Sequence, residues 1–252
     1  MVKGLLDGKV AVISGAASPR GLGYATAVLF ADQGARVALL DIDAKGVGEA
    51  GARLGEAHRA YVCDVTDRVA CKTVMGEVVR DFGTIDVLIN NAGLTQAIGL
   101  LDIEDSDWDR ILDVNLRGVL NLSQAAVPHM KAKGGAIACT SSVSAQRGGG
   151  ILGGPHYSAA KAGVLGLAKA MAREFGPFGI RVNCVTPGLI STDINAGKIA
   201  AHKEREIVAS IPLSRLGRPS DVAGCFLFLA SDLSAYVTGA VIDVNGGMLI
   251  HG

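Results

Sequence analysis

Short apolar runs alternate along the chain with longer segments in which apolar residues recur every three or four positions. The short runs are rich in β-branched residues and apolar at successive positions, which is typical of strands buried on both faces. The longer segments have the period of amphipathic helices. The predicted strands are Lys9–Ser14, Arg36–Leu40, Arg59–Cys63, Ile85–Ile89, Ala136–Thr140, Ile180–Val185 and Ala240–Val244. The predicted helices are Gly21–Gln33, Ala44–Leu54, Val69–Phe82, Trp108–Lys131, His156–Phe175 and Pro219–Leu229.

This alternation of strands and helices predicts an α/β fold. Strands joined through helices form a parallel sheet, and right-handed crossovers place helices on both of its faces. We therefore expect a Rossmann-type doubly wound parallel sheet of about seven strands, with ligands bound beyond the carboxyl ends of the strands. The sequence has no internal repeat and no low-complexity linker, so residues 1–252 are expected to form one domain that carries every site.

Composition excludes several classes of protein. Lys plus Arg and Asp plus Glu each number 24, and no basic stripe is present, so we expect no nucleic-acid partner. No apolar run reaches the ~18 residues of a membrane span, and Met1–Lys9 lacks the apolar stretch of a secretion signal. The five cysteines are scattered without a Cys-x-x-Cys pair. We therefore expect a cytoplasmic protein with reduced thiols, no membrane partner and no metal site.

A glycine-rich loop follows the first predicted strand. Gly15 permits a tight turn, Gly21 lets the backbone approach a pyrophosphate, and Gly23 lets the next helix pack closely on the strand. The amino end of that helix offers N–H groups and a positive dipole to an anion. The loop therefore predicts a dinucleotide site, with Arg20 and Leu22 among its contacts.

Asp41 ends the second predicted strand, 18 residues after Gly23. A carboxylate at this place accepts hydrogen bonds from the adenosine ribose and repels a 2′-phosphate, so it predicts NAD. Arg20 favours NADP instead, because a cation beside the loop can hold a 2′-phosphate. We give more weight to Asp41, whose constraint is the more direct, and Asp43 is a second candidate for its role.

In their joint order, these and later motifs resemble the short-chain dehydrogenases/reductases, and the resemblance covers nearly the whole chain. It rests on the glycine loop and on Asp64-Val65, Asn90-Asn91-Ala92-Gly93, Asn115, Ser141-Ser142, Tyr157-Ser158-Ala159-Ala160-Lys161, Pro187-Gly188 and Asp243–Gly247. The resemblance implies hydride transfer between a nicotinamide cofactor and a small alcohol or ketone.

Tyr157 and Lys161 are four positions apart, so they share one helix face. A phenol has a pKa of about 10, and a nearby ammonium lowers it, so we expect Tyr157 to act as acid and base. Ser142 is expected to hydrogen-bond the substrate oxygen. The resemblance implies that Lys161 also holds the nicotinamide ribose and that Asn115 positions a water linking Lys161 to solvent.

Two spacings depart from the family pattern. The glycine loop is longer by two residues, which we place at Pro19-Arg20. Ser142 lies two residues farther from Tyr157 than is usual in the family, whereas Ser144 lies at the usual spacing. The strand context favours Ser142, and Ser144 stays open as the alternative.

Further contacts are carried over from the resemblance. Those to the cofactor are Asp64 and Val65 at the adenine, Asn91, Ala92 and Gly93 along the ribose, and Pro187, Gly188 and Thr192 beside the nicotinamide. The predicted substrate rim is Leu94–Gly99, Gln146–Pro155 and Leu189–Ile211, with Gln146, Arg147 and His156 as polar candidates and a lid over Ile194–Ser210.

The sequence thus predicts an NAD-dependent oxidoreductase of a small polar secondary alcohol or ketone, such as a polyol, sugar or hydroxy acid. The alternative enzyme is an NADP-dependent 3-ketoacyl thioester reductase. A dinucleotide-binding sensor or scaffold is the non-enzyme alternative, and the presence of Tyr157 and Lys161 opposes it. The resemblance implies a homotetramer that uses Trp108–Lys131 and His156–Phe175, and the apolar segment Met248-Leu249-Ile250 indicates another contact.

Overall fold

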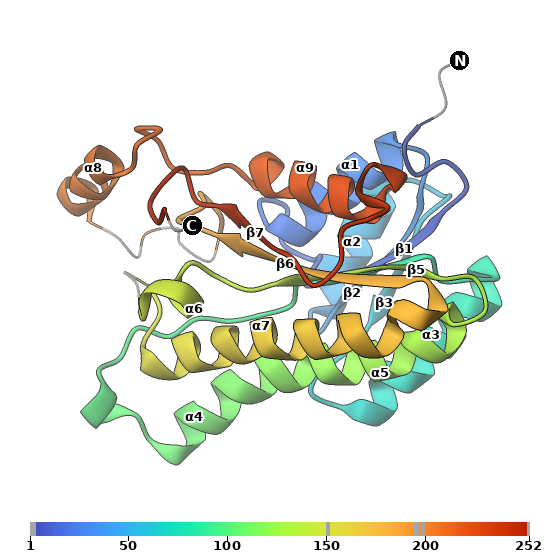
Figure 1. Cartoon of the computed structure of the whole chain (residues 1–252), viewed down its shortest axis with the longest axis horizontal. Helices are drawn as coiled ribbons and strands as arrows, with labels where there is room; N and C mark the ends of the chain where they lie inside the picture. Colours follow the sequence, from blue (N-terminus) through green and yellow to red (C-terminus); the bar gives the residue numbers. More distant parts are fainter. Residues whose placement is uncertain (1–3, 150–151, 194–196, 198–199, 251–252) are drawn as a thin grey trace.

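The computed structural model describes residues 4–149, 152–193, 197 and 200–250. A central parallel sheet lies between two layers of helices (Figure 1). Its seven strands have the order β3-β2-β1-β4-β5-β6-β7 in the described residues. They are β1 (Val10–Ser14), β2 (Arg36–Asp41), β3 (Arg59–Val62), β4 (Val87–Asn90), β5 (Gly135–Thr140), β6 (Ile180–Pro187) and β7 (Val241–Val244).

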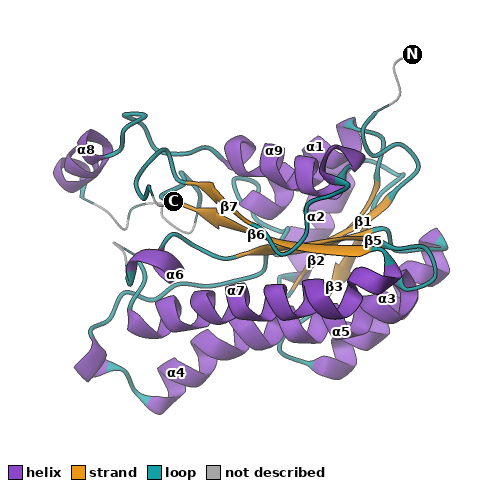
Figure 2. Ribbon diagram, in the orientation of Figure 1, coloured by secondary structure: helices purple, strands orange, loops and turns teal. Residues whose placement is uncertain are grey.

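Helices cover both faces of the sheet (Figure 2). The first face carries α1 (Leu22–Asp32), α2 (Ala44–Leu54) and α9 (Pro219–Ala230), and the second carries α3 (Arg68–Phe82), α5 (Gly118–Met130) and α7 (Pro155–Phe175). The remaining helices are α4 (Asp105–Leu112), α6 (Ser144–Arg147), α8 (Ala201–Ser210) and the short 3₁₀ turns Leu100–Asp102, Gly176–Phe178 and Asp232–Ser234.

These observations confirm the predicted fold, a Rossmann-type doubly wound sheet. One predicted helix differs in form: Trp108–Lys131 is divided into α4 and α5 by a π-helical turn over Asp113–Arg117. The fourth strand begins at Val87 rather than at Ile85. Helices α6 and α8 were not predicted, because each is short and lies in a segment without a clear helical period.

The strand order reverses between β1 and β4, which are neighbours in the sheet although β2 and β3 separate them in sequence. At such a reversal the connections leave to opposite faces, and a crevice opens beyond the carboxyl ends of the strands. Neighbouring residues of β1 pack against opposite layers of helices. Val12 packs with the layer of α3, α5 and α7, and Ile13 packs with the layer of α1 and α9.

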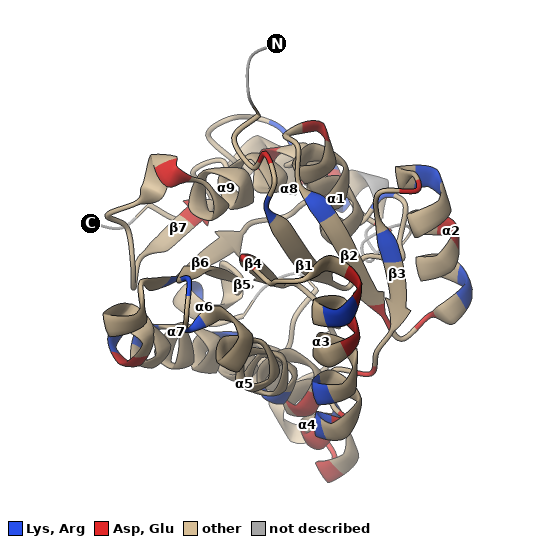
Figure 3. Cartoon of the chain, turned by 90° about the vertical axis from the view of Figure 1, so that its right-hand side faces the viewer, with Lys and Arg blue, Asp and Glu red and all other residues tan. Residues whose placement is uncertain are grey.

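Charged residues are interspersed over the outer helices. In the view of Figure 3, Lys and Arg alternate with Asp and Glu on α2, α3 and α4, with no extended basic stripe. In the described part of the chain, no helix combines the length and the hydropathy that a membrane crossing requires.

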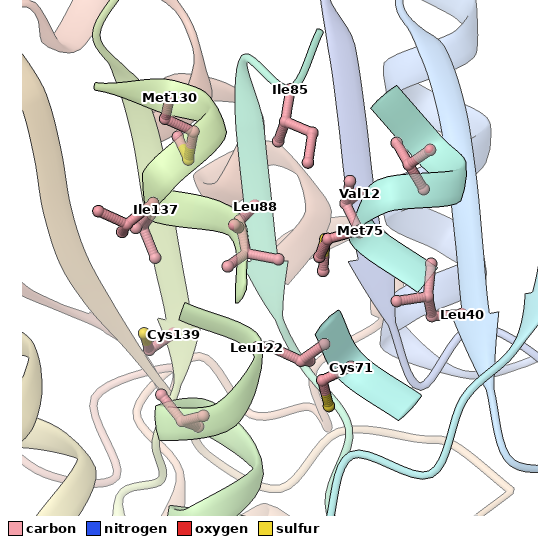
Figure 4. Close-up of a cluster of buried hydrophobic side chains, with 14 of the residues drawn as sticks. Val12, Leu40, Cys71, Met75, Ile85, Leu88, Leu122, Met130, Ile137 and Cys139 are labelled. Carbon is pink, nitrogen blue, oxygen red and sulfur yellow. The ribbon is translucent and has the colours of Figure 1, made fainter. Parts of the chain in front are cut away.

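Leu88 tests the packing of the hydrophobic core between the sheet and the layer of α3, α5 and α7. It is 0% exposed in the middle of β4, where it faces Met75, Leu122 and Ile137 (Figure 4). We expect Leu88→Ala to lower the free energy of unfolding by about 2–5 kcal/mol, because the cavity adds to the lost transfer energy. Chemical denaturation measures the change. Val69→Ala, at a position that is 74% exposed, is the control and should change the stability by less than about 0.5 kcal/mol. Equal effects of the two substitutions would contradict the packing described.

Candidate active site

A cavity of about 300 Å³ lies at the carboxyl ends of the strands, across the reversal of strand order. All four predicted catalytic residues line it: Asn115, Ser142, Tyr157 and Lys161. Nine predicted cofactor contacts line it as well: Gly15, Gly21, Leu22, Asp41, Asn91, Gly93, Pro187, Gly188 and Thr192. The cavity therefore brings together residues that the sequence spreads over more than half of the chain.

The glycine loop is shaped by close backbone contacts. Gly15 has φ +69°, and a Cβ there would lie 2.8 Å from the Cα of Ala92. A Cβ on Gly23 would overlap the carbonyl oxygen of Gly15 and lie 2.9 Å from the Nδ2 of Asn91. Gly21 is the N-cap residue of α1. The free N–H groups of the first turn of α1 therefore lie at the cavity, where they can receive an anion.

Asp41 lies beside this loop at the end of β2. Its Oδ2 accepts a hydrogen bond from the backbone N–H of Ala17 (2.9 Å), and its Oδ1 accepts one from the N–H of Asp43 (3.1 Å). Asp43 caps α2 by accepting from the N–H of Gly46 (3.0 Å) and does not line the cavity. Of the two candidates, Asp41 is the one that faces the site.

Arg20 pairs with Asp193, a residue of the predicted rim Leu189–Ile211 for which no partner was predicted. Its Nε and Nη2 lie 2.6 and 2.5 Å from Oδ1 of Asp193, which lines the cavity. Ser18 donates to Oδ2 of the same carboxylate (2.5 Å). No local pattern indicates a pair whose members are 173 residues apart.

Lys161 is buried beneath the cavity. It is 3% exposed, and its Nζ donates to the carbonyl oxygen of Thr140 (2.9 Å). Burial lowers the pKa of Lys161 to about 8, because desolvation disfavours the charged form. Tyr157 lies one helical turn earlier in α7, with its ring centroid 5.8 Å from the Lys161 Nζ.

The pKa of Tyr157 is raised, which differs from the lowering predicted from Lys161. Burial of the phenol is the larger cause, and a hydrogen bond with the Ser142 hydroxyl lowers the pKa in part. This hydrogen bond also pairs Tyr157 with Ser142 rather than with Ser144. Ser144 instead donates its backbone N–H to the Ser142 Oγ (3.1 Å) and starts α6.

Asn115 lies in the π-helical turn that divides the predicted long helix. Its Nδ2 donates to the carbonyl oxygens of Leu94 and Ile111 (2.9 Å each), whereas its buried Oδ1 has no partner among the described residues. A Cβ on Gly93 would lie 2.7 Å from this Oδ1 and 3.3 Å from the Lys161 Nζ. Both polar atoms thus face the same glycine. π-Helical turns of this kind often mark functional sites.

Several predicted residues lie outside the cavity lining: Arg20, Gly23, Asp64, Val65, Ala92, Gln146 and His156. His156 is 0% exposed and hydrogen-bonds through Nε2 to Gln96 (3.1 Å), so it does not reach the substrate side. Gln146 donates to Asp243 (3.0 Å). Asp64 accepts from Thr66 and shapes a turn.

Most of the substrate side comes from loops. The lining residues that were not named individually in advance are Ser18, Leu94, Thr95, Thr140, Ser141, Val143, Leu152, Gly153, Leu189, Ile190, Asp193 and Met248. The predicted lid falls partly on residues 194–196 and 198–199, which lie outside the described residues, and its remainder includes α8.

Known proteins match this chain over nearly its whole length. A family model described as enoyl-(acyl carrier protein) reductase matches residues 15–249. A short-chain type dehydrogenase/reductase of Sinorhizobium fredii is 66% identical over 98% of this chain and 100% of its own length. A 3-oxoacyl-[acyl-carrier-protein] reductase of Thermotoga maritima is 45% identical over 97% of this chain and 99% of its own.

A solved structure extends the similarity to the backbone. The crystal structure of a short-chain dehydrogenase/reductase of the glucose/ribitol dehydrogenase type from Brucella melitensis superimposes with a TM-score of 0.92 at 32% identity, covering 99% of this chain and 100% of that chain. The chain belongs to the short-chain dehydrogenase/reductase family. It is therefore an oxidoreductase that uses a nicotinamide dinucleotide.

Gly23 tests the cofactor side of the site. We expect Gly23→Ala to weaken the binding of NAD and NADP alike by at least about tenfold, because the new methyl group displaces the Gly15 carbonyl and the Asn91 side chain. Gly76→Ala is the matched control, since a Cβ on Gly76 meets open space within α3. Isothermal titration measures both. Unchanged affinity in Gly23→Ala would contradict the role given to this loop.

Proposed function

We propose that the chain interconverts a secondary alcohol and a ketone with NAD as cofactor and Tyr157 as acid and base. One observation carries the proposal: a single cavity holds Ser142, Tyr157 and Lys161 and continues to the glycine loop and Asp41. The loop has the close backbone approaches that a pyrophosphate cradle needs, and the unpartnered Oδ1 of Asn115 is a polar atom that a water can satisfy.

The described residues fit the dinucleotide along its length. Gly15, Gly21 and Leu22 would receive the pyrophosphate and Asp41 the adenosine ribose, with Asp64 and Val65 toward the adenine. The nicotinamide half would lie against Lys161, Asn91, Ala92, Gly93, Pro187, Gly188 and Thr192. The bound cofactor supplies the hydride acceptor or donor, and the protein supplies the proton transfer and the orientation.

Proton transfer is assigned to Tyr157. Its phenolate takes the alcohol proton during oxidation, and its phenol returns a proton during reduction. Ser142 hydrogen-bonds the substrate oxygen and stabilises the charge that develops on it. A protonated Lys161 favours the phenolate and offsets the rise in pKa that burial causes. A water held by Asn115 Oδ1 links Lys161 to solvent.

The cofactor is proposed to be NAD because a carboxylate, Asp41, lies where the adenosine ribose would bind. The position of Arg20 supports this choice, since its guanidinium is paired with Asp193.

The substrate is proposed to be a small hydroxy acid, one of the three polar classes predicted from the sequence. Apolar side chains dominate the cavity wall beyond Tyr157: Leu94, Val143, Leu152, Leu189, Ile190 and Met248. They give a polyol or a sugar few hydrogen-bonding partners. Arg147 also lines the cavity and is exposed, so it can hold a carboxylate at the rim.

The second candidate is NADP-dependent reduction of a 3-ketoacyl thioester. The Thermotoga maritima relative, a 3-oxoacyl-[acyl-carrier-protein] reductase, favours it, and the same apolar wall would accept an acyl chain. The Brucella melitensis structure, which is named for glucose/ribitol dehydrogenase, favours a polyol or sugar instead.

We further propose a homotetramer, as the family resemblance implies, and a cytoplasmic location.

A substrate panel tests the proposed reaction. Purified protein would receive NAD or NADP with short hydroxy acids, polyols, aldoses and simple secondary alcohols. We expect reduced nicotinamide to form with NAD and a hydroxy acid. Tyr157→Phe should abolish this turnover and leave the dissociation constant for NAD within about twofold, because it removes only the proton-transferring group. Substantial turnover by Tyr157→Phe would refute the acid–base assignment, and consumption of NADPH with 3-ketoacyl thioesters alone would favour the second candidate.

The pH dependence tests the pairing of Tyr157 with Lys161. Oxidation needs a deprotonated Tyr157 beside a protonated Lys161, so kcat/KM for oxidation should rise with pH through an inflection that belongs to the coupled pair. Reduction needs the protonated pair and should fall over the same range. Lys161→Met should move the inflection up by about 1–3 pH units, since no cation then favours the phenolate. An inflection that stays in place would show that Lys161 does not tune Tyr157.

A further inference from the structure

An ion pair joins the glycine loop to the segment that follows β6. Arg20 and Asp193 lie 2.5 Å apart through Nη2 and Oδ1, with side chains 71% and 34% exposed. Ser18 donates to the other carboxylate oxygen at 2.5 Å. Both oxygens of Asp193 are therefore engaged by donors of the glycine loop.

These donors lie next to the place proposed for the adenosine ribose. The loop residue Ala17 donates its N–H to Asp41, and Ser18, which follows it, lines the cavity together with Asp41 and Asp193. A hydroxyl and a guanidinium on this loop are the groups that a 2′-phosphate would need, because they offer hydrogen bonds and a compensating positive charge. In this structure both groups donate to Asp193 instead.

We propose that Asp193 is a specificity-determining residue: by holding the Ser18 hydroxyl and the Arg20 guanidinium, it withholds from NADP the donors that would bind its 2′-phosphate. Asp193 thus acts together with Asp41, which repels that phosphate directly. This inference deepens the proposed use of NAD and rests on it. It also gives the inserted Pro19-Arg20 a role, since the insertion supplies the cation that Asp193 holds.

The Asp193 carboxyl group stays ionised at neutral pH. The Ser18 hydroxyl and the Arg20 guanidinium both lower the pKa of its carboxyl group. The ion pair is partly exposed, so water and salt weaken it, and its effect on specificity is expected to be moderate rather than absolute.

The experiment measures equilibrium binding of NAD and NADP by isothermal titration, which needs no substrate. Asp193→Asn removes the charge and keeps the shape of the side chain. We expect the dissociation constant for NADP to fall about tenfold, with that for NAD changed by less than about twofold, because only NADP carries the 2′-phosphate. An unchanged NADP-to-NAD ratio would overturn the inference.

Asp221→Asn is the matched control. Asp221 forms a similar exposed ion pair with Arg215 (2.6 Å), and it does not line the cofactor cavity. The substitution changes the net charge of the protein by the same amount. If it raises NADP affinity as much as Asp193→Asn does, the gain reflects overall charge, and the inference fails.

A triple variant tests whether Asp193 acts through the two donors that it holds. In a Ser18→Ala/Arg20→Ala background, Asp193→Asn should no longer improve NADP binding by more than a small part of its single effect. An equal improvement in that background would mean that Asp193 repels the phosphate by its own charge, which would overturn the inference.

The proposed use of NAD is tested separately in the same titrations. A wild-type protein that binds NADP more tightly than NAD would contradict the proposed cofactor, whatever Asp193→Asn does. Asp41→Ala should likewise relax the preference for NAD. The preference of the wild-type protein tests the proposed use of NAD. The change in the NADP-to-NAD affinity ratio on substituting Asp193 tests only the role of Asp193, so failure of one proposal can be distinguished from failure of the other.

Discussion

Hydrogen bonds of the Asn91 side chain connect the carboxyl ends of β1, β4 and β5. The glycine loop and the surroundings of Lys161 both depend on this connection. Its Nδ2 donates to the carbonyl oxygens of Ser14 (3.1 Å) and Gly15 (3.2 Å), and its Oδ1 accepts from the Thr140 hydroxyl (3.2 Å). The carbonyl of Thr140 in turn receives Lys161 (2.9 Å). A continuous line of hydrogen bonds therefore runs from the glycine loop to the buried ammonium. In a low-dielectric interior such hydrogen bonds are strong, so the line fixes the position of Lys161 relative to the glycine loop.

The same line explains how a lysine can be buried under a cavity. A buried ammonium is costly unless its protons are accepted, and the Thr140 carbonyl takes one of them. A further polar atom, the Asn115 Oδ1, faces the same glycine, Gly93, as the Lys161 Nζ does. The cost of burial is visible in the lowered pKa of Lys161. A group that titrates near neutral pH is useful for proton transfer, whereas a surface lysine with its ordinary pKa is not.

The fold and the positions of Tyr157 and Lys161 at one cavity could be predicted from the sequence because local patterns encode them. Buried strands show as apolar runs, and Tyr157 and Lys161 show as a helical pair. The π-helical turn at Asn115 could not be predicted, since the apolar period continues through it. The pairing of Arg20 with Asp193 and the hydrogen bond of His156 with Gln96 join residues that are far apart in sequence, so they could not be predicted. The raised pKa of Tyr157 likewise follows from the depth of its burial, which no spacing reveals.

The cofactor side of the cavity and the substrate side differ in how they are built. Strand ends, glycines and the start of α1 form the cofactor side, so backbone geometry defines it and the family pattern constrains it. The substrate side consists mainly of loop side chains such as Leu94, Leu152 and Met248. Loops on a rigid scaffold tolerate exchange of such side chains without loss of the fold. Proteins that match this chain over nearly its whole length therefore carry the names of a 3-oxoacyl-[acyl-carrier-protein] reductase and of a glucose/ribitol dehydrogenase. The proposed specificity residues, Arg147 and Asp193, accordingly lie at the exposed rim, whereas the buried hydrogen-bond network surrounds the groups proposed to transfer the proton.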